Sequence, residues 1–292
     1  MSGLHSRFKW SKMTIRKSIF VLIILLLSTF FLYAKEYTRI VSLAPSVTKS
    51  LYELGAESYV KGITVFCPKG SIKKEIIGTL LEPNIEKIAY INPDLIIASK
   101  DGNDRAVVDK LRRLGFEVYV MEKSESFKDI CSNYRTLAEK INRAKEASNT
   151  ISKAEVYVDR LHSKLSKSVS LRVFWEIGNN PLYTAGGKSF ANDYNAYSNT
   201  INAYNDINKN YFQVFREDVM KRNPDIILLV NLGDMSKEEL SFWRKYKMLN
   251  AVQNNRVFII DSEDMFAPAP LTFAENLSFL AKIVYGDVLN VK

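Results

Sequence analysis

Apolar residues along this chain fall into short runs that alternate with segments of helical periodicity. The runs hold five to seven residues, rich in branched and aromatic side chains, and this pattern favours buried strands. The predicted strands are 39–43, 94–98, 117–121, 171–177, 225–230 and 256–260. Apolar residues three or four positions apart predict helices at 47–54, 104–114, 126–140, 238–247 and 271–285. Strands that alternate with helices indicate an α/β fold with mostly parallel sheets.

A longer amphipathic segment interrupts this alternation. Its apolar residues form one stripe from Ala144 to Leu165, spaced alternately three and four positions apart, which predicts one long helix. We therefore expect two β/α lobes, residues 35–140 and 168–292, joined by a linker helix at 141–167, with a ligand cleft between them. His162 lies on this helix beside the stripe, where a packed or solvated histidine is expected rather than a ligand.

The N-terminus has the pattern of an export signal. Sixteen uncharged residues, 18–33, follow Arg16 and Lys17 and end at Ala34. A positive start, a short apolar stretch and a small residue at the cut predict a signal peptide at 1–34 and a mature chain outside the cytoplasm, in the periplasm. The alternative is a retained membrane anchor, although the stretch is shorter than the roughly 20 residues that span comfortably. Translation could also begin at Met13, which opens a shorter signal.

The positive charge of the chain depends on this leader. The net charge is +9, from 41 basic and 32 acidic residues. The segment 1–34 holds five of the basic residues and no acid, so 36 basic and 32 acidic residues remain, a net charge of +4. The remainder has no polybasic run, and we expect no nucleic-acid partner.

The sequence lacks the residue patterns of several kinds of metal, catalytic and phosphate-binding site. Two cysteines and two histidines disfavour a Cys-rich metal site and His-centred catalysis. The segment 185–189 resembles the end of a phosphate-binding loop, but Leu182 stands where the first glycine is required, so a glycine turn at the cleft rim is the better interpretation. We therefore expect that the protein is not an enzyme, that it carries no cofactor of its own and that it has no metal site. An oxidising compartment permits a Cys67–Cys131 disulfide, but nothing in the sequence places the two thiols close together.

The two halves contain a repeat. Residues 84–97 align without a gap against residues 215–228, at an offset of 131 residues. Each copy is a helix with an early glutamate, an Asn-Pro-Asp turn and an apolar strand. Proline explains the helix end, because the residue before a proline avoids the α conformation. The repeat indicates two similar lobes.

These features resemble the class III substrate-binding proteins of ABC importers, which include the vitamin B12-binding and iron–siderophore-binding families. The segments that match family motifs are 40–46, 62–68, 84–86, 92–97, 114–118 and 249–258. The resemblance implies an exported, monomeric binder that delivers a metal-bearing chelate to a membrane permease. A corrinoid such as vitamin B12 is slightly ahead of a ferric siderophore or haem, because no arginine falls on the predicted cleft loops. The alternative function is a membrane-tethered sensor or interaction domain on the same fold.

Ligands of such lobes bind at the carboxyl ends of the strands, in the cleft between domains. For any one residue there, ordinary core packing is the competing interpretation. The Asn- and Tyr-rich segment 190–212 departs from the family, as compositional drift or as a remodelled ligand wall. The predicted ligand-binding residues are Pro45, Ser46, Phe66, Cys67, Lys100, Gly102, Trp175, Asn179, Tyr183, Asn231, Phe266 and Pro268.

The repeat also predicts a docking surface. Glu86 and Glu217 hold the same position in the two copies. In the families that this chain resembles, one surface glutamate on each lobe pairs with arginines of the permease, and these two residues match that position. The alternative is that each glutamate only complements the dipole at the start of its helix.

Overall fold

The computed structural model describes residues 35–231, 236–261 and 265–286. The chain divides into two compact units, residues 1–36 and 37–292, and both of its sheets belong to the second unit. The predicted signal peptide, 1–34, lies outside the described residues.

The first sheet is parallel throughout. Its strand order is β3-β2-β1-β4-β5, and every neighbouring pair runs in the same direction. Helices cover both faces, because side chains alternate along β1 and β4: Ile40 and Ile97 face α2 and α5, whereas Val41 and Ile96 face α3 and α4. The elements are β1 (Ile40–Ser42), α2 (Pro45–Glu53), a 3-10 turn (Glu57–Tyr59), β2 (Val60–Ile63), β3 (Glu75–Ile76), α3 (Ile85–Ile91), β4 (Leu95–Ser99), α4 (Arg105–Arg113), β5 (Val118–Met121) and α5 (Phe127–Lys140).

The second sheet is mixed. Its order is β11-β10-β6-β7-β9, with β8 paired to β6. The strands β8, β10 and β11 continue the parallel pattern, whereas β7 turns back beside β6 as a hairpin and β9 runs antiparallel to β7. The elements are β6 (Leu171–Asn179), β7 (Leu182–Ala185), α7 (Ala191–Tyr197), β8 (Thr200–Asn202), β9 (Tyr211–Gln213), α8 (Arg216–Arg222), β10 (Ile226–Asn231), α9 (Ser236–Arg244), α10 (Asn250–Gln253), β11 (Val257–Asp261) and α12 (Pro270–Tyr285).

The Asn-Pro-Asp repeat has the same structural role in both copies. Asn92 and Asn223 end α3 and α8 in the left-handed conformation, with φ of 50° and 43°. The aspartate that follows the proline then accepts backbone N–H groups from the neighbouring strand region: Asp94 from Arg39 at 3.1 Å, and Asp225 from Arg172 at 2.9 Å. Each copy therefore stops a helix and fixes the start of the next strand against the sheet.

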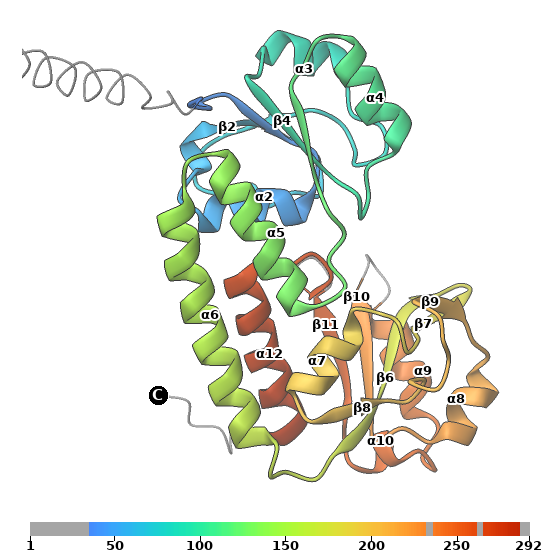
Figure 1. The fold of residues 1–292 in the computed structure, drawn as a ribbon. Coiled ribbons are helices and arrows are strands. Elements are labelled where there is room, and N and C mark those ends of the chain that lie inside the picture. Colours follow the sequence, from blue (N-terminus) through green and yellow to red (C-terminus); the bar gives the residue numbers. More distant parts are fainter. Residues whose placement is uncertain (1–34, 232–235, 262–264, 287–292) are drawn as a thin grey trace, which may run out of the picture. The chain divides into compact units, whose positions relative to one another are not determined.

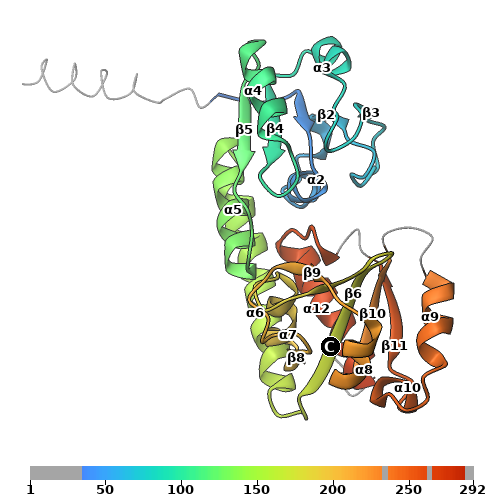
Figure 2. The same ribbon diagram turned by 90° about the vertical axis from the view of Figure 1, so that its right-hand side faces the viewer.

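The long helix forms where the apolar stripe predicts it. Helix α6 spans Ala144–Leu165, and the stripe residues from Ala147 onward are buried. Figure 1 shows α6 beside α5 and α12, and one continuous core cluster includes residues of all three helices and of both sheets. The hydroxyl of Tyr157 on α6 donates to Ser278 Oγ on α12 at 2.8 Å. Helix α12 thus supports the lower part of the linker helix, and α5 lies beside its upper part (Figure 1); Figure 2 gives the view turned by 90°.

The structure answers two questions that the sequence left open, the pairing of the two cysteines and the surroundings of His162. Cys67 and Cys131 are free, buried thiols, so the permitted disulfide is absent between them. Cys67 instead shares a hydrogen bond with Thr64 Oγ1 at 3.1 Å. His162 is packed edge-on against Tyr197, and its Nδ1 lies 3.1 Å from the Tyr197 carbonyl oxygen.

Candidate functional site: a pocket between the two sheets

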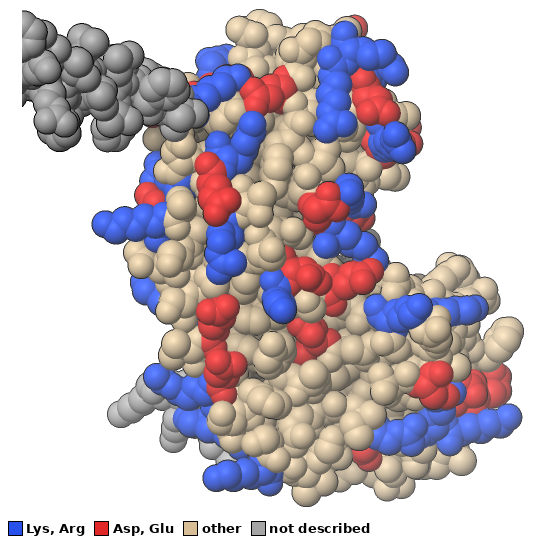
Figure 3. Space-filling model, in the orientation of Figure 1, with Lys and Arg blue, Asp and Glu red and all other residues tan. Residues whose placement is uncertain are grey.

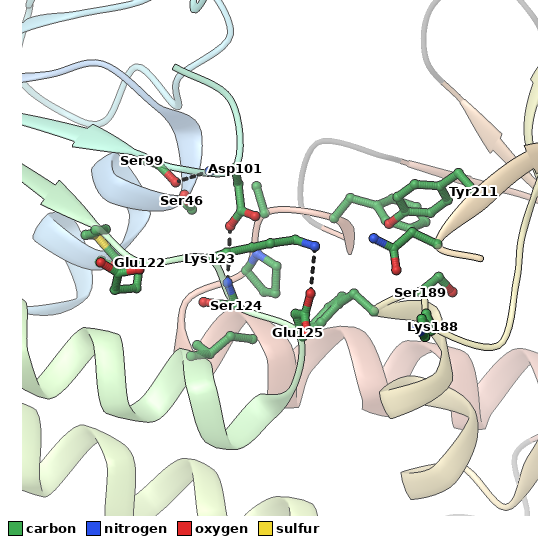
Figure 4. A pocket seen from close by; sticks show the side chains of 18 residues that line it. Ser46, Ser99, Asp101, Glu122, Lys123, Ser124, Glu125, Lys188, Ser189 and Tyr211 are labelled. Atoms are coloured by element: carbon green, nitrogen blue, oxygen red, sulfur yellow. Dashed lines mark hydrogen bonds and ion pairs between the residues drawn. The ribbon is translucent and has the colours of Figure 1, made fainter. Parts of the chain in front are cut away.

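A pocket of about 230 Å³ lies where loops of the two lobes meet. The first lobe contributes the start of α2 and the loops that follow β4 and β5, so the carboxyl ends of three parallel strands point to it. The second lobe contributes the turn after β7, the start of β9 and the segment before α12. Figure 4 shows these side chains around the cavity. The lining residues are Ser46, Ser50, Ser99, Asp101, Met121, Glu122, Lys123, Ser124, Glu125, Ile130, Lys188, Ser189, Phe190, Asn210, Tyr211, Phe266, Ala267 and Pro268.

The charges that line the pocket nearly balance. Lys123 Nζ lies 2.8 Å from Glu125 Oε1, and this hydrogen bond raises the pKa of Lys123 (Figure 4). Asp101 accepts the backbone N–H of Ser124 at 3.4 Å, and partial burial raises the pKa of Asp101. No arginine is among the described residues that line the pocket. The walls are therefore weakly acidic and rich in hydroxyl groups.

An aromatic wall closes one side. The ring of Phe266 meets Trp175 edge-on at 6.2 Å and Tyr211 at 6.5 Å between centroids. Trp175 is only 1% exposed, and its Nε1 donates to Asn195 Oδ1 at 3.3 Å. Trp175 therefore supports Phe266 from the core, while Phe266 and Tyr211 line the cavity. Apolar ring surface of this kind suits a large flat ligand.

Two glycines hold the turn that carries Lys188 into the pocket. A Cβ on Gly186 would lie 2.3 Å from the Lys209 carbonyl oxygen, and one on Gly187 would lie 2.4 Å from that of Asn205. Asn192 donates to the Gly186 carbonyl at 2.8 Å, and Asn202 donates to the Ala185 carbonyl at 3.0 Å. The Asn-rich segment thus braces this turn, and its residues Asn210 and Tyr211 form part of the wall.

The structure brings only some of the predicted ligand residues to this pocket. Ser46, Phe266 and Pro268 line it. Pro45 opens helix α2 directly before Ser46, and Lys100 lies beside the pocket, with its Nζ 2.6 Å from Glu122 Oε2. The predicted residues therefore meet the cavity on the α2 side and at the segment before α12.

The other predicted residues lie elsewhere. Phe66 is 59% exposed outside the lining, and Gly102 packs against Leu80. The side chain of Asn231 lies outside the described residues. Cys67 and Trp175 belong to the core, whereas Asn179 and Tyr183 lie at the β6–β7 hairpin, outside the lining. Trp175 is buried because strand β6 is covered on both faces, so that side chains on either face lie in a core.

Sequence reasoning missed the loop 122–125, which supplies four lining residues. The available signal was a charged run directly after the strand predicted at 117–121. It also missed Asp101, one residue beyond the predicted Lys100.

A second group of acids lies buried behind the second sheet. Glu176, fully buried, accepts Trp243 Nε1 at 2.6 Å, and burial raises the pKa of Glu176 to about 8. Both nitrogens of the Arg216 fork donate to Glu239 at 2.9 Å. Burial acts to raise the pKa of Glu239, but Arg216 outweighs it and lowers that pKa. These acids fix α8 and α9 on the sheet and do not line the pocket.

The predicted docking glutamates lie on two separate helices. Glu86 is in the first turn of α3 and Glu217 in the first turn of α8, and both are exposed. Within the described residues neither carboxylate has an ion pair or hydrogen bond. The adjacent cations are engaged elsewhere, Lys87 by the Ile76 carbonyl at 2.9 Å and Arg216 by Glu239.

A family model for periplasmic binding proteins matches residues 40–263. The chain belongs to the periplasmic binding protein family. The vitamin B12-binding protein of Yersinia pseudotuberculosis is 26% identical over 223 residues, which cover 76% of this chain and 79% of that protein.

Solved structures of the family share the fold. A possible iron-binding solute-binding protein from Staphylococcus epidermidis is 27% identical, with a TM-score of 0.75, and covers 86% of this chain and 100% of its own. The vitamin B12-binding protein BtuF of Vibrio cholerae is 23% identical, with a TM-score of 0.72 and coverage of 87% and 99%. The haem-binding protein RhuT from Roseiflexus is 20% identical, with a TM-score of 0.76 and coverage of 85% and 97%.

Membership of the periplasmic binding protein family confirms the resemblance that the sequence motifs indicated. The solved structures confirm the predicted two-lobed α/β fold. Among the described residues, no helix is long and apolar enough to cross a membrane. On the face shown in Figure 3, lysines and arginines are interspersed with aspartates and glutamates, without a large patch of one sign.

Proposed function

We propose that this periplasmic binding protein captures a metal-bearing chelate, with a corrinoid ahead of a ferric siderophore or haem, and delivers it to the permease of an ABC importer. The observation that carries the proposal is the pocket between the lobes, where Phe266 and Tyr211 offer ring surface and no described arginine offers a fixed positive charge. The two lysines that line the pocket, Lys123 and Lys188, are offset by Asp101, Glu122 and Glu125. Without an arginine fork, which binds carboxylates best, the walls favour an uncharged amide-rich chelate that needs hydrogen bonds and flat apolar surface.

The pocket is too small to enclose a large chelate. Its volume of about 230 Å³ lies below the roughly 300–1,000 Å³ of pockets that enclose a small ligand. A large planar chelate would therefore be held along one edge, with the remainder in the open mouth of the cleft. The protein supplies binding and orientation, and it acts as a monomer without catalysis or a nucleic-acid partner.

The visible spectrum tests the ligand class. Protein purified from its native host is measured as isolated, then again after cyanocobalamin or haemin has been added and the unbound chelate removed by gel filtration. We expect a corrinoid band that co-elutes with the protein. Retention of haemin alone would replace the corrinoid by haem, and retention of neither would overturn both of these ligands and leave the ferric siderophore.

Export and cleavage near Ala34 form a second part of the proposal, supported by the charge-flanked apolar stretch 18–33. Intact-mass measurement of the native protein should give the mass of residues 35–292 in the periplasmic fraction. A mass that includes residues 18–34, in the membrane fraction, would favour the tethered sensor.

Glu86 and Glu217 complete the proposal as the permease-docking pair. Two exposed carboxylates, one on each lobe and without described partners, suit paired arginines on a two-fold permease. The double variant Glu86→Ala/Glu217→Ala should keep its chelate affinity and lose uptake, and the loss relative to the wild type should be smaller at high salt, because salt screens the ion pairs that only the wild type makes. Full uptake at limiting chelate would show that the two residues only stabilise their helices.

A further inference from the structure

An exposed aromatic ring accompanies each docking glutamate. Tyr90 is 90% exposed, the highest value among the large apolar side chains of the described residues, and lies four residues after Glu86. Phe215 is 72% exposed and lies two residues before Glu217. Single exposed apolar side chains are common on monomers, so these two rings stand out by their position beside the two glutamates and not by exposure alone.

Helix α3 presents its glutamate and its tyrosine together. Ile88 and Ile91 are buried and attach the helix to the sheet. Glu86 and Tyr90 are exposed and one turn apart, a spacing that places two side chains side by side on a helix. An acid and a ring therefore form one small surface on the first lobe.

Phe215 stands where the helix itself would favour another residue. It is the N-cap residue of α8 and makes no side-chain capping bond. The equivalent residue in the first lobe is Asn84, whose Oδ1 accepts the Lys87 N–H at 2.9 Å. Asparagine caps helices well, whereas phenylalanine does not, and this ring is not buried. Neither capping nor packing accounts for Phe215.

The chain already contains an arginine held by an acid and a ring. Glu239 binds both nitrogens of the Arg216 fork, while the guanidinium carbon of Arg216 lies 3.8 Å from the centroid of the Phe242 ring. Glu239 and Phe242 are three residues apart on one helix. A guanidinium group accepts a carboxylate at its edge and a ring on its face at the same time.

We propose that Tyr90 with Glu86, and Phe215 with Glu217, each form a receptor for one arginine of the permease, in which the glutamate binds the edge of the guanidinium and the aromatic ring stacks on its face. This inference rests on the docking part of the proposed function and names the residues that complete it. The partner is a membrane protein with one exposed arginine facing each lobe. The rings provide contact area that salt does not screen.

The test measures binding to the importer that the native host pairs with this protein, reconstituted in lipid nanodiscs. The variants are Tyr90→Ala and Phe215→Asn, with Tyr90→Phe as the conservative variant and Phe279→Ala, an exposed ring on α12, as the control. Tyr90→Ala and Phe215→Asn should each weaken importer binding by roughly three- to tenfold. Tyr90→Phe and Phe279→Ala should bind like the wild type.

Phe215→Asn separates a docking role from a structural one. Asparagine should cap α8 as Asn84 caps α3, so the melting temperature should rise or stay unchanged while importer binding falls. Chelate affinity should stay unchanged in every variant.

The outcomes distinguish this inference from the proposed function. Equal importer binding by Tyr90→Ala, Phe215→Asn and the wild type would overturn the role of the rings, even if Glu86→Ala/Glu217→Ala fails to bind. An equal loss in Phe279→Ala would also overturn it, because the effect would not be local to the two glutamates. Absence of wild-type binding to the importer would overturn docking and the ring receptors together.

Discussion

Glu53 joins the two walls of the pocket, and its removal should loosen both. It ends helix α2, whose first turns line the pocket through Ser46 and Ser50. Its carboxylate accepts the backbone N–H of Leu271 at 3.1 Å and both the N–H and the hydroxyl of Thr272 at 2.9 and 2.8 Å. These donors open helix α12, which has no side-chain cap of its own and follows the aromatic wall.

The magnitude follows from the lost cap. Loss of a helix N-terminal acceptor costs about 0.5–2 kcal/mol, and a charged acceptor is near the upper part of that range. Burial raises the pKa of Glu53, which shows that part of this gain is offset by removing the charge from water. We therefore expect Glu53→Ala to lower the free energy of unfolding by about 1 kcal/mol, or the melting temperature by roughly 2–4 °C for a unit of this size.

Two measurements check this prediction. Thermal unfolding at pH 7 compares Glu53→Ala with Glu53→Gln, which keeps one acceptor oxygen and should lose less, and with Glu155→Ala, an exposed acid on α6, which should lose nothing measurable. Titration with the chelate should show weaker binding by Glu53→Ala, roughly two- to tenfold, because the walls are no longer preorganised. A variant as stable as the wild type, with the same affinity, would refute the view that this bond fixes the pocket.

Three further changes test other parts of the account. Trp175→Ala removes a ring from the core and should cost roughly 3–5 kcal/mol in urea unfolding; an effect on affinity without loss of stability would place the ring in the cleft after all. Phe266→Ala should weaken chelate binding by roughly 1–3 kcal/mol with a smaller effect on stability, and unchanged affinity would remove this ring from the site. The raised pKa of Glu176 means that the folded chain keeps a proton which the unfolded chain releases above its ordinary pKa of 4.5. Wild-type stability should therefore fall as the pH rises from about 4.5 to about 8, and Glu176→Gln should flatten that decline; parallel curves for the two proteins would contradict the assignment.

The regular elements were predictable because burial has a period. The stripe from Ala147 to Leu165 is buried as its spacing requires, and the apolar runs at 94–98 and 225–230 form the interior strands β4 and β10. The Asn-Pro-Asp turn could be predicted to end a helix, because proline and a left-handed asparagine affect only the backbone next to them. The short strands β3, β8 and β9 lie outside the predicted apolar runs, so no such signal marks them.

The pocket was harder to predict because its walls are loops. Ser46, Phe266 and Pro268 were found by following the strand ends, but loop residues have no periodicity that assigns their direction. Trp175 was predicted in the cleft because it lies near the end of a strand. The central strand β6 is covered on both faces at that point, so the ring of Trp175 is buried. The bond from Glu53 to α12 joins residues 218 positions apart, and no local pattern indicates it.

Equilibrium dialysis of the mature chain, residues 35–292, against cyanocobalamin tests the central claim most directly. We expect one cyanocobalamin bound per chain, with a dissociation constant of about 1 μM or below, which corresponds to roughly 8 kcal/mol of binding free energy. The same experiment on Phe266→Ala should give the same stoichiometry and weaker binding. Failure of the wild-type chain to retain cyanocobalamin at concentrations of about 100 μM would contradict the assignment of this pocket to a corrinoid.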